Sequence, residues 1–382
     1  MSPGVSNRAG KPPGEKSPPH LFTIQHLAER YAFPSALSGK GECIAILEFG
    51  GSVAANDFDR YFLSLNRPVP DIHFENLSAI QPLNVYSEHD KEVALDIEVA
   101  GAFAPGARIV AYFSTNDEQG WIHAVSRALY DTKHRPSVLC ISWGAAEDWW
   151  TEDTVRVLNR LFAEAAGMGI TICAASGDDG CATNGSGYCR VNFPASSPFV
   201  LACGGTVFHA DGSEVVWNVR NRFASGGGIS DILERPSWQS RLCAATSKIA
   251  PRRNSRFDGR QLPDVAGPAG DYNIYVGGCY HSGMGTSAAA AFWSALVARI
   301  NEGLKTRGLP PVGFLNPLLY KDHKVQQTFH SVTEGQNDPF AVCGYRACPA
   351  WNPCTGWGTP HGEKLLNRLL ELSRGRESGQ RL

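Results

Sequence analysis

The stretch from Gly277 to Leu304 reads GGCYHSGMGTSAAAAFWSALVARINEGL. Its small residues give way to an apolar run, and the alanines and spaced large side chains of that run predict a buried helix beginning near Ser287. The first backbone N–H groups of a helix lack intrahelical partners, and the helix dipole favours negative charge there. A serine hydroxyl at this point can attack a carbonyl and have the resulting oxyanion stabilised. A plain serine cap is the commoner explanation of so short a motif.

Composition narrows the class of protein. Hydrophobic residues make up 43% of the 382 residues and charged residues 19%, so the chain can bury a large core. A net charge of −2 without a long basic run argues against a nucleic-acid partner. Since no apolar stretch reaches about 18 residues, we expect no membrane span. We expect one domain at 21–373, between a disordered leader at 1–20, which lacks the apolar core of a secretion signal, and a disordered tail at 374–382.

The hydrophobic pattern alternates between apolar, strand-like segments and segments of helical periodicity. This alternation predicts an α/β fold with a parallel sheet covered on both faces. We expect 66–90 to be a polar loop and 205–285 to be a long loop-bearing insert of the same domain. The predicted strands are 42–49, 108–113, 137–143, 170–175 and 199–203, and the predicted helices are 22–32, 56–65, 91–104, 121–130, 154–167 and 362–372.

Several polar residues stand where such a fold places its active site, outside the carboxyl ends of the strands. Glu48, Trp143 and Asp178 lie at these positions, although Asp178 is also in a sequence typical of a turn. Glu92 and Asp96 are four residues apart and so lie on one helix face, among apolar neighbours and without a basic partner. Two like charges there are destabilising unless they share a proton or have partners, which favours a functional pair over a solvated acidic face.

The blocks that contain these residues resemble the sedolisin family of serine-carboxyl peptidases (peptidase family S53), and they look most like its kumamolisin branch. The resemblance extends from about residue 21 to 372. Each block is weak evidence alone, but their order together is highly specific. The blocks are ECIAILEFGG, EVALDIEVAGAFAPGARI, ISWG, AASGDDG, FPASSPFVLACGGT, LPDVAG, GTSAAA, FHSVTEG and WNPCTGWG.

The resemblance implies a subtilisin-like fold with a parallel sheet of about seven strands flanked by helices. It makes Ser287 the nucleophile, Glu92 the general base and Asp96 the residue that orients Glu92 through a hydrogen bond. Asp178 becomes the acid of the oxyanion hole, while Glu48 and Trp143 extend the hydrogen-bond chain behind the carboxylates. The reference pKa values of these carboxyls lie near 4, so we expect activity to be highest in acid.

The chain departs from the family pattern at the structural calcium site, which is built from two Asp carboxylates and backbone carbonyls. Calcium gains affinity from carboxylate charge, so we expect this site to be lost or weakened. No cofactor is required for the predicted chemistry. The positions that align with the calcium loops are Ser331, Val332, Cys348, Ala350 and Asn352.

The eleven cysteines include no CxxC pair, which argues against a zinc site. Four of them lie in apolar strand-like runs and are expected to be buried. In the loops, the pairs Cys181–Cys189 and Cys343–Cys348 are candidate disulfides that would close loops, the second in place of the calcium ion, with reduced thiols as an equally good alternative. The four in apolar runs are Cys43, Cys140, Cys173 and Cys203.

These features predict an acid-acting serine endopeptidase whose partners are polypeptide substrates and which is a monomer. Two alternatives remain: a tripeptidyl-peptidase-like exopeptidase, and a catalytically silent scaffold that binds peptides. Asn192 stands where kumamolisin-like enzymes have an Asp in the first specificity pocket, so a preference for Arg or Lys before the scissile bond should weaken. The sequence leaves the localisation unknown, since only the family resemblance suggests extracellular action.

Overall fold

A central sheet of seven parallel strands runs through the computed structural model, which describes residues 23–78, 87–181, 189–242, 258–340 and 344–377. A short strand, β9 (Glu214–Val216), adds antiparallel to one of them. The subtilisin-like α/β fold predicted from the resemblance is therefore confirmed. In spatial order the parallel strands are β14 (Val265–Pro268), β8 (Leu201–Phe208), β6 (Thr171–Ala175), β4 (Val138–Ile141), β1 (Cys43–Glu48), β3 (Arg108–Phe113) and β2 (Asp71–Asn76).

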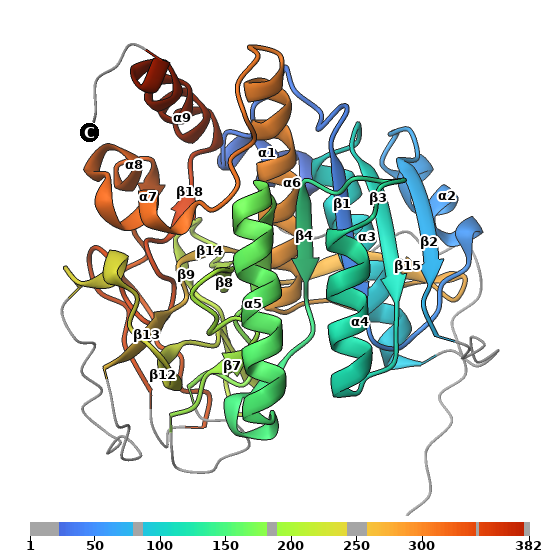
Figure 1. Ribbon diagram of the computed structural model, residues 1–382. Coiled ribbons are helices and arrows are strands. Elements are labelled where there is room, and N and C mark those ends of the chain that lie inside the picture. The colour runs from blue at the N-terminus through green and yellow to red at the C-terminus, as the bar shows by residue number, and fades with distance from the viewer. Residues whose placement is uncertain (1–22, 79–86, 182–188, 243–257, 341–343, 378–382) are drawn as a thin grey trace, which may run out of the picture.

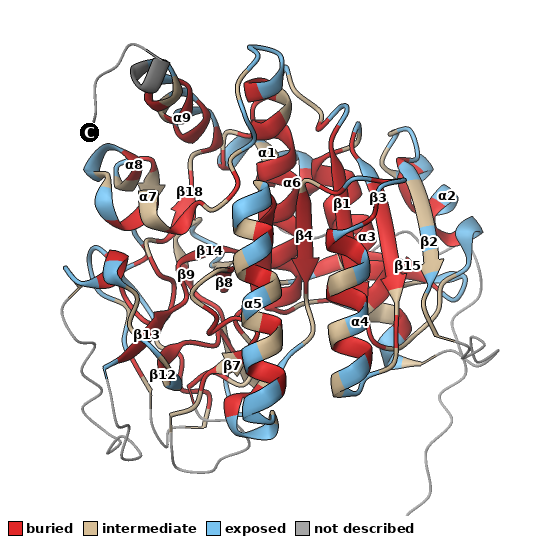
Figure 2. Cartoon of the chain, viewed as in Figure 1, coloured by how far each residue is buried: buried red, intermediate tan, exposed pale blue. Residues whose placement is uncertain are grey.

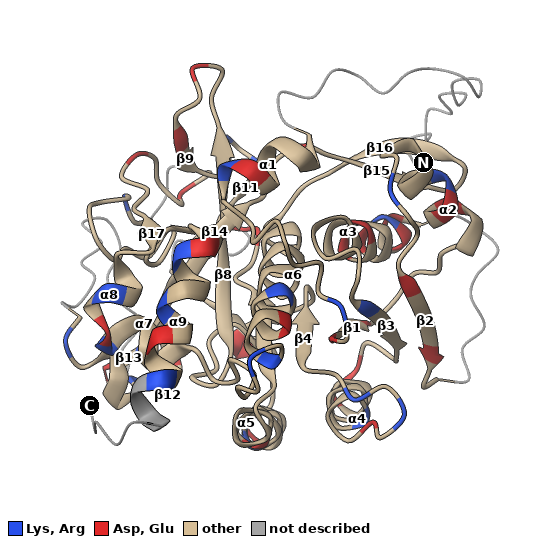
Figure 3. Cartoon of the chain, turned by 90° about the horizontal axis from the view of Figure 1, so that it is seen from above, with Lys and Arg blue, Asp and Glu red and all other residues tan. Residues whose placement is uncertain are grey.

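Helices cover both faces of this sheet (Figures 1 and 3). Strand β1 shows why: Ile44 and Ile46 pack into the core under one helix layer, while Ala45 and Leu47 pack into the core under the other. Figure 2 shows the central strands as a buried layer between the helices, whereas the edge strand β2 is partly exposed. One layer contains α2 (Ala55–Ser64), α3 (Glu88–Phe103) and α6 (Thr286–Lys305), and the other contains α4 (Glu118–Leu129) and α5 (Glu152–Met168).

The buried helix predicted at Ser287 is α6, and it is buried around almost its whole circumference. Ala288 to Ala291 are fully buried, and their small side chains let the helix lie close to the sheet and to α3. The Trp293 indole N–H donates to the Ala266 carbonyl at 2.8 Å and fastens α6 to β14. Ser287 is therefore held at the end of one of the most firmly packed elements of the fold.

The remaining elements lie around this core. The helices are α1 (Ile24–Arg30), α7 (Asn316–Lys321), α8 (His323–Gln326) and α9 (Gly362–Glu377). Small antiparallel pairs join β5 (Ala145–Ala146) to β7 (Asn192–Phe193), β10 (Asn218–Val219) to β11 (Phe223–Ala224), β12 (Gly228–Glu234) to β13 (Gly259–Leu262), β15 (Tyr272–Val276) to β16 (Cys279–Gly283) and β17 (Phe329–His330) to β18 (Thr359–Pro360).

Three predictions from the sequence are wrong in part. The supposed polar loop at 66–90 contains β2, an edge strand whose exposed residues hide the strand pattern. The supposed insert at 205–285 supplies β14, a strand of the central sheet itself, because its short run of small residues carries no periodicity. The last helix does not stop at Leu372 but continues to Glu377, into the predicted tail.

The four strand cysteines are buried, as predicted. Of the two alternatives left open for Cys181 and Cys189, the structure has the disulfide. Cys348 has no disulfide partner within the described ranges, and Cys343 lies outside them, so the second pair stays a prediction. The predicted leader also lies outside the described residues. Among the described helices, none is long and apolar enough to cross a membrane.

Candidate active site

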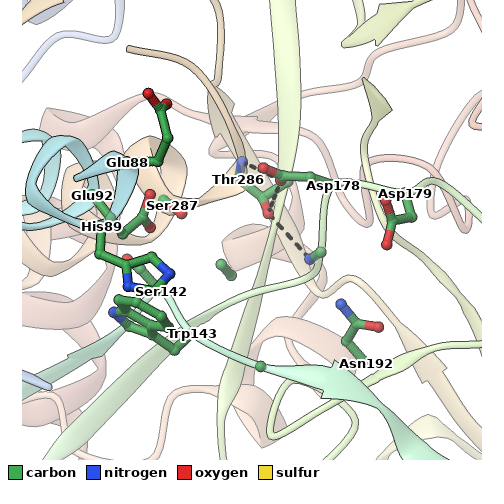
Figure 4. A pocket seen from close by; sticks show the side chains of 13 residues that line it. Glu88, His89, Glu92, Ser142, Trp143, Asp178, Asp179, Asn192, Thr286 and Ser287 are labelled. Atoms are coloured by element: carbon green, nitrogen blue, oxygen red, sulfur yellow. Dashed lines mark hydrogen bonds between the residues drawn. The ribbon is translucent and has the colours of Figure 1, made fainter. Parts of the chain in front are cut away.

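A cavity of about 320 Å³ opens at the carboxyl-terminal edge of the sheet, where the loops after β4 and β6 meet the first turns of α3 and α6 (Figure 4). It contains three of the four residues predicted to be catalytic, namely Ser287, Glu92 and Asp178, together with Trp143 and Asn192. The other lining residues are Glu88, His89, Ser142, Gly144, Ala175, Gly177, Asp179 and Thr286.

Ser287 is the second residue of α6, and 5% of its surface is exposed. Gly285 caps the helix without a side-chain hydrogen bond, at a φ of 132° that L-residues rarely adopt. A Cβ at this position would lie 2.5 Å from the Asp178 Oδ2 atom, so only glycine lets Asp178 approach the helix. The run before Ser287 forms the β15–β16 hairpin followed by this tight turn.

Glu92 projects from the first turns of α3 toward Ser287 (Figure 4). The Ser287 hydroxyl is near enough to stabilise the ionised Glu92 carboxylate by a hydrogen bond, which lowers the pKa of Glu92. Burial raises the pKa of Glu92 to about 7 against the opposing effect of the Ser287 hydrogen bond, and the charge of Asp178 raises it further. Once ionised, Glu92 is therefore a much stronger base than a carboxylate in water, and it is already aimed at the hydroxyl.

Behind Glu92 lie two fully buried carboxyls, Glu48 and Asp96. The Trp143 indole N–H donates to Glu48 Oε2 at 2.9 Å, and the Ser142 hydroxyl donates to Asp96 Oδ1 at 2.7 Å. Glu48 Oε1 and Asp96 Oδ2 have no hydrogen-bond partner in the part of the chain that the structure describes. Burial, followed by the charges of neighbouring carboxyls, raises both pKa values well above their ordinary range. Protons held on these oxygens therefore stabilise the pair.

The predicted hydrogen bond between Asp96 and Glu92 stays a prediction. The Oδ1 atom of Asp96 accepts from Ser142, its Oδ2 atom has no partner among the described residues, and the charge of Glu92 raises the pKa of Asp96. Ser142 was missed by the sequence analysis, although it lies in the ISWG block directly before Trp143. Its hydroxyl fixes the rotamer of Asp96 beneath Glu92.

Asp178 follows β6 and is held by Thr286, the first residue of α6. The Thr286 backbone N–H and hydroxyl both donate to Asp178 Oδ1 at 2.8 Å, and the Gly177 N–H donates to the Thr286 hydroxyl at 3.1 Å (Figure 4). Burial raises the pKa of Asp178 to about 6 despite the two hydrogen bonds from Thr286. In acid its Oδ2 atom can carry a proton and donate it toward a group bound beside Ser287. Thr286 was also missed, although it precedes Ser287 in the GTS motif.

Sequence comparison with known proteins agrees with this geometry. The chain matches the model of the subtilase family, Peptidase_S8, over residues 85–344. Kumamolisin from Bacillus sp. (strain MN-32) is 42% identical over 370 residues, which are 93% of this chain and 65% of kumamolisin. A solved structure of Pseudomonas sedolisin, a serine-carboxyl proteinase in complex with two molecules of pseudo-iodotyrostatin, superposes with a TM-score of 0.73 at 25% identity, covering 89% of this chain and 97% of sedolisin.

The chain belongs to the subtilase family, and its similarity to kumamolisin and sedolisin is consistent with the sedolisin family of serine-carboxyl peptidases. It is also similar to tripeptidyl-peptidase 1 of Bos taurus, at 35% identity over 251 residues, 62% of this chain and 43% of that relative. The chain thus spans less than two thirds of the length of either curated relative.

The calcium positions of the family carry a different set of contacts here. The Asn352 side chain is fully buried, and its Nδ2 atom donates to the carbonyls of Val332 at 3.2 Å and Cys348 at 3.1 Å. The exposed Ser331 hydroxyl donates to the Ala350 carbonyl at 3.5 Å. Among the described residues, no cluster of three or more His, Cys, Asp and Glu side chains could hold a metal ion. The donor groups of Asn352 and Ser331 do not fit a cation, because they point N–H and O–H hydrogens at the carbonyls.

The raised pKa of Glu92 predicts that its charge destabilises the fold. The pKa of Glu92 in the folded state lies near 7, above the reference of 4.5, so the folded state is more stable when Glu92 is protonated. This stabilisation is complete below about pH 4.5 and is lost as pH rises through 7. We predict that Glu92→Gln increases the free energy of unfolding at pH 7.5 by on the order of 1–3 kcal/mol and leaves it unchanged at pH 4. Chemical denaturation at the two pH values measures both differences.

Glu88→Gln is the matched control, because Glu88 lines the same cavity but is exposed and paired with Lys91. The free energy of unfolding of Glu88→Gln should show no increase over wild type that becomes larger between pH 4 and pH 7.5. An unchanged stability of Glu92→Gln at pH 7.5 would contradict the prediction.

Proposed function

We propose that this protein hydrolyses peptide bonds as a serine-carboxyl peptidase. The observation that carries the proposal is the approach of the Glu92 carboxyl to the Ser287 hydroxyl in one cavity, at the N-terminus of α6. It places a hydroxyl beside a carboxyl whose pKa is raised to about 7, at the point of the fold where an oxyanion is favoured. The relationship to kumamolisin and sedolisin supports the same chemistry.

In the first step, the Ser287 hydroxyl attacks the substrate carbonyl while Glu92 accepts its proton. The developing oxyanion lies between the first turn of α6 and Asp178, whose protonated Oδ2 donates a hydrogen bond. Glu92 then transfers the proton to the leaving amine, and the C–N bond breaks to leave an acyl ester on Ser287. A water molecule, deprotonated by Glu92, hydrolyses that ester and restores the Ser287 hydroxyl.

The neighbours behind Glu92 assist by staying neutral. Protonated Glu48 and Asp96 spare Glu92 the repulsion of two further charges when it ionises, and Ser142 and Trp143 hold them in position. Thr286 positions Asp178 in the same way. Its backbone N–H and hydroxyl both donate to Oδ1, which leaves Oδ2 of Asp178 for the substrate. The site therefore needs no group beyond side chains of this chain.

A tripeptidyl-peptidase mode is the second candidate, favoured by the similarity to tripeptidyl-peptidase 1. Peptides with free and acetylated N-termini distinguish the two modes. An endopeptidase cleaves both forms, whereas an exopeptidase that binds the free amine releases tripeptides only from the first.

Replacement of Ser287 by alanine should abolish hydrolysis. We expect Ser287→Ala to lower kcat/KM by about four orders of magnitude or more, because the members of such a constellation act as a unit. Ser294→Ala is the control: Ser294 lies on the same helix, outside the cavity, and its hydroxyl donates to the Ala290 carbonyl at 2.8 Å. The assay is cleavage of a peptide library with circular dichroism as a check on folding. Substantial turnover by Ser287→Ala would refute the nucleophile assignment.

The pKa values predict a bell-shaped dependence of kcat/KM on pH. Activity needs Glu92 ionised, which fails as pH falls, and Asp178 protonated, which fails as pH rises. With pKa values of about 7 and about 6, the maximum lies on the acid side of neutrality or close to it. An asparagine at position 178 donates a hydrogen bond without titrating, so Asp178→Asn should lose the alkaline limb. Persistence of that limb in the variant, or a wild-type optimum at pH 8, would contradict these roles.

A further inference from the structure

Two polar side chains of the cavity have no contact that satisfies them, and both lie across the cavity from Glu92 and His89 (Figure 4). Asp179 is half-buried, and the described residues provide neither a hydrogen bond nor an ion pair for its carboxylate. The Asn192 amide is likewise without a side-chain hydrogen bond in the described part of the chain. Among the described residues that line the cavity there is no Lys or Arg. A partly desolvated carboxylate and an amide oxygen in such a lining favour a ligand that brings a cation.

The backbone keeps Asp179 in place. The neighbouring Gly180 N–H donates to the Ala224 carbonyl, and the Ala224 N–H donates to the Asp178 carbonyl, so this segment pairs with β11. Asn192 begins β7, which pairs with β5. Both side chains therefore project from fixed backbone into the pocket where Asn192 was expected to replace an acidic residue.

On the basis of the proposed peptidase function, we propose that Asp179 supplies the anion of the first specificity pocket. The pocket then accepts a lysine or arginine side chain before the scissile bond, with the ammonium or guanidinium group bound between the Asp179 carboxylate and the Asn192 amide oxygen. The acidic residue missing at position 192 is thus replaced from the neighbouring loop. The pKa of Asp179 is raised by burial, which a bound cation would counteract.

The test uses quenched peptides that differ only before the scissile bond, with lysine or its uncharged analogue norleucine. We expect wild-type kcat/KM to be about 10–100-fold higher for lysine. Asp179→Asn should reduce this ratio to nearly one and change turnover of the norleucine peptide little. Glu88→Gln, which removes an exposed carboxylate from the same lining, should keep the wild-type ratio, and Asn192→Asp should increase it.

The outcomes separate this proposal from the proposed function. If wild-type protein cleaves the norleucine peptide without preferring lysine, or if Asp179→Asn keeps the preference, the role of Asp179 is overturned while the peptidase stands. If neither peptide is cleaved at any pH, the proposed function itself fails.

A second and independent observation concerns Asn352. Its Oδ1 atom accepts from the backbone N–H groups of Cys354 at 3.0 Å and Thr355 at 3.1 Å, so the amide cannot be turned around. Its Nδ2 atom must then face the carbonyls of Val332 and Cys348. Those two loops are joined by hydrogen bonds at the place where the family positions a cation.

We infer that the Asn352 amide holds these loops in place of calcium and makes the fold independent of the ion. An amide does not titrate, whereas carboxylate ligands lose calcium as they are protonated. The contact therefore persists in the acid range where the proposed reaction is favoured.

Asn352→Asp replaces the amide N–H donors that face the two carbonyls by a carboxylate oxygen, with almost no change in the shape of the side chain. One carboxylate oxygen would still accept from Cys354 and Thr355, but the other would face two carbonyls and need a cation between them. We expect the melting temperature of the wild type to be the same in EDTA and in millimolar calcium. The variant should melt several degrees lower in EDTA and recover in calcium.

Asn352→Ala is the control at the same position. It removes the hydrogen bonds to Val332 and Cys348 without supplying a carboxylate. It should destabilise the fold without any rescue by calcium. Should Asn352→Asp fail to fold, competition with a fluorescent chelator measures calcium binding by the wild type alone. Tight binding by the wild type, or an Asn352→Asp variant indifferent to calcium, would overturn the inference.

Discussion

The close packing of α3 against α6 is the contact on which the site depends. Glu92 and Ser287 come from elements far apart in sequence, and their hydrogen bond forms only if the two helices approach closely at their first turns. Small residues make that approach possible on the α6 side, while the rings of Phe103 and Phe292 meet edge to face at 5.1 Å further along. The Arg299 guanidinium also donates to the Phe103 carbonyl at 2.6 Å and ties α6 to the end of α3. A change of helix spacing by one methyl group would therefore separate base and hydroxyl.

The same packing buries several carboxyl groups close together, which makes their ionised forms unfavourable. Glu48, Asp96 and Glu92 share a region without a cationic side chain among the described partners of their carboxyls, so their charge is compensated by protons. This arrangement is stable in acid and weaker as pH rises, which is the reverse of a fold held together by salt bridges. The proton on Asp178 serves both stability and function, because it neutralises a buried carboxyl and lets that carboxyl donate to the oxyanion. The proton on Glu92 serves stability alone, since Glu92 must be ionised to act as the base.

Much of this could be predicted from the sequence, because buried strands and the long buried helix are strongly apolar. The edge strand β2 and the strand β14 could not, since an exposed strand alternates weakly and Val265–Pro268 is too short for a period. The site residues could be named because each stands beside a strand end or in a motif. Their partners Ser142 and Thr286 could not, because a single hydroxyl acquires its role only from the carboxyl that the fold brings to it. Asn352 was recognisable as a lost ligand, but not as a replacement for the ion.

The loops held by Asn352 are connected to the site itself. Asn337 donates to the Pro353 carbonyl beside Asn352, and its own carbonyl accepts from the Cys181 N–H at 2.9 Å. Cys181 begins the disulfide-closed loop that follows Asp178 and Asp179. A loosening at Asn352 would thus reach the two aspartates through Asn337 and the chain between Cys181 and Asp178. The proposed roles of both aspartates depend on the exact position of a carboxyl oxygen. A side-chain contact at Asn352 that neither dissociates nor titrates therefore helps to keep these oxygens in place. An amide meets both requirements at any pH, whereas carboxylate ligands hold calcium less tightly as falling pH protonates them.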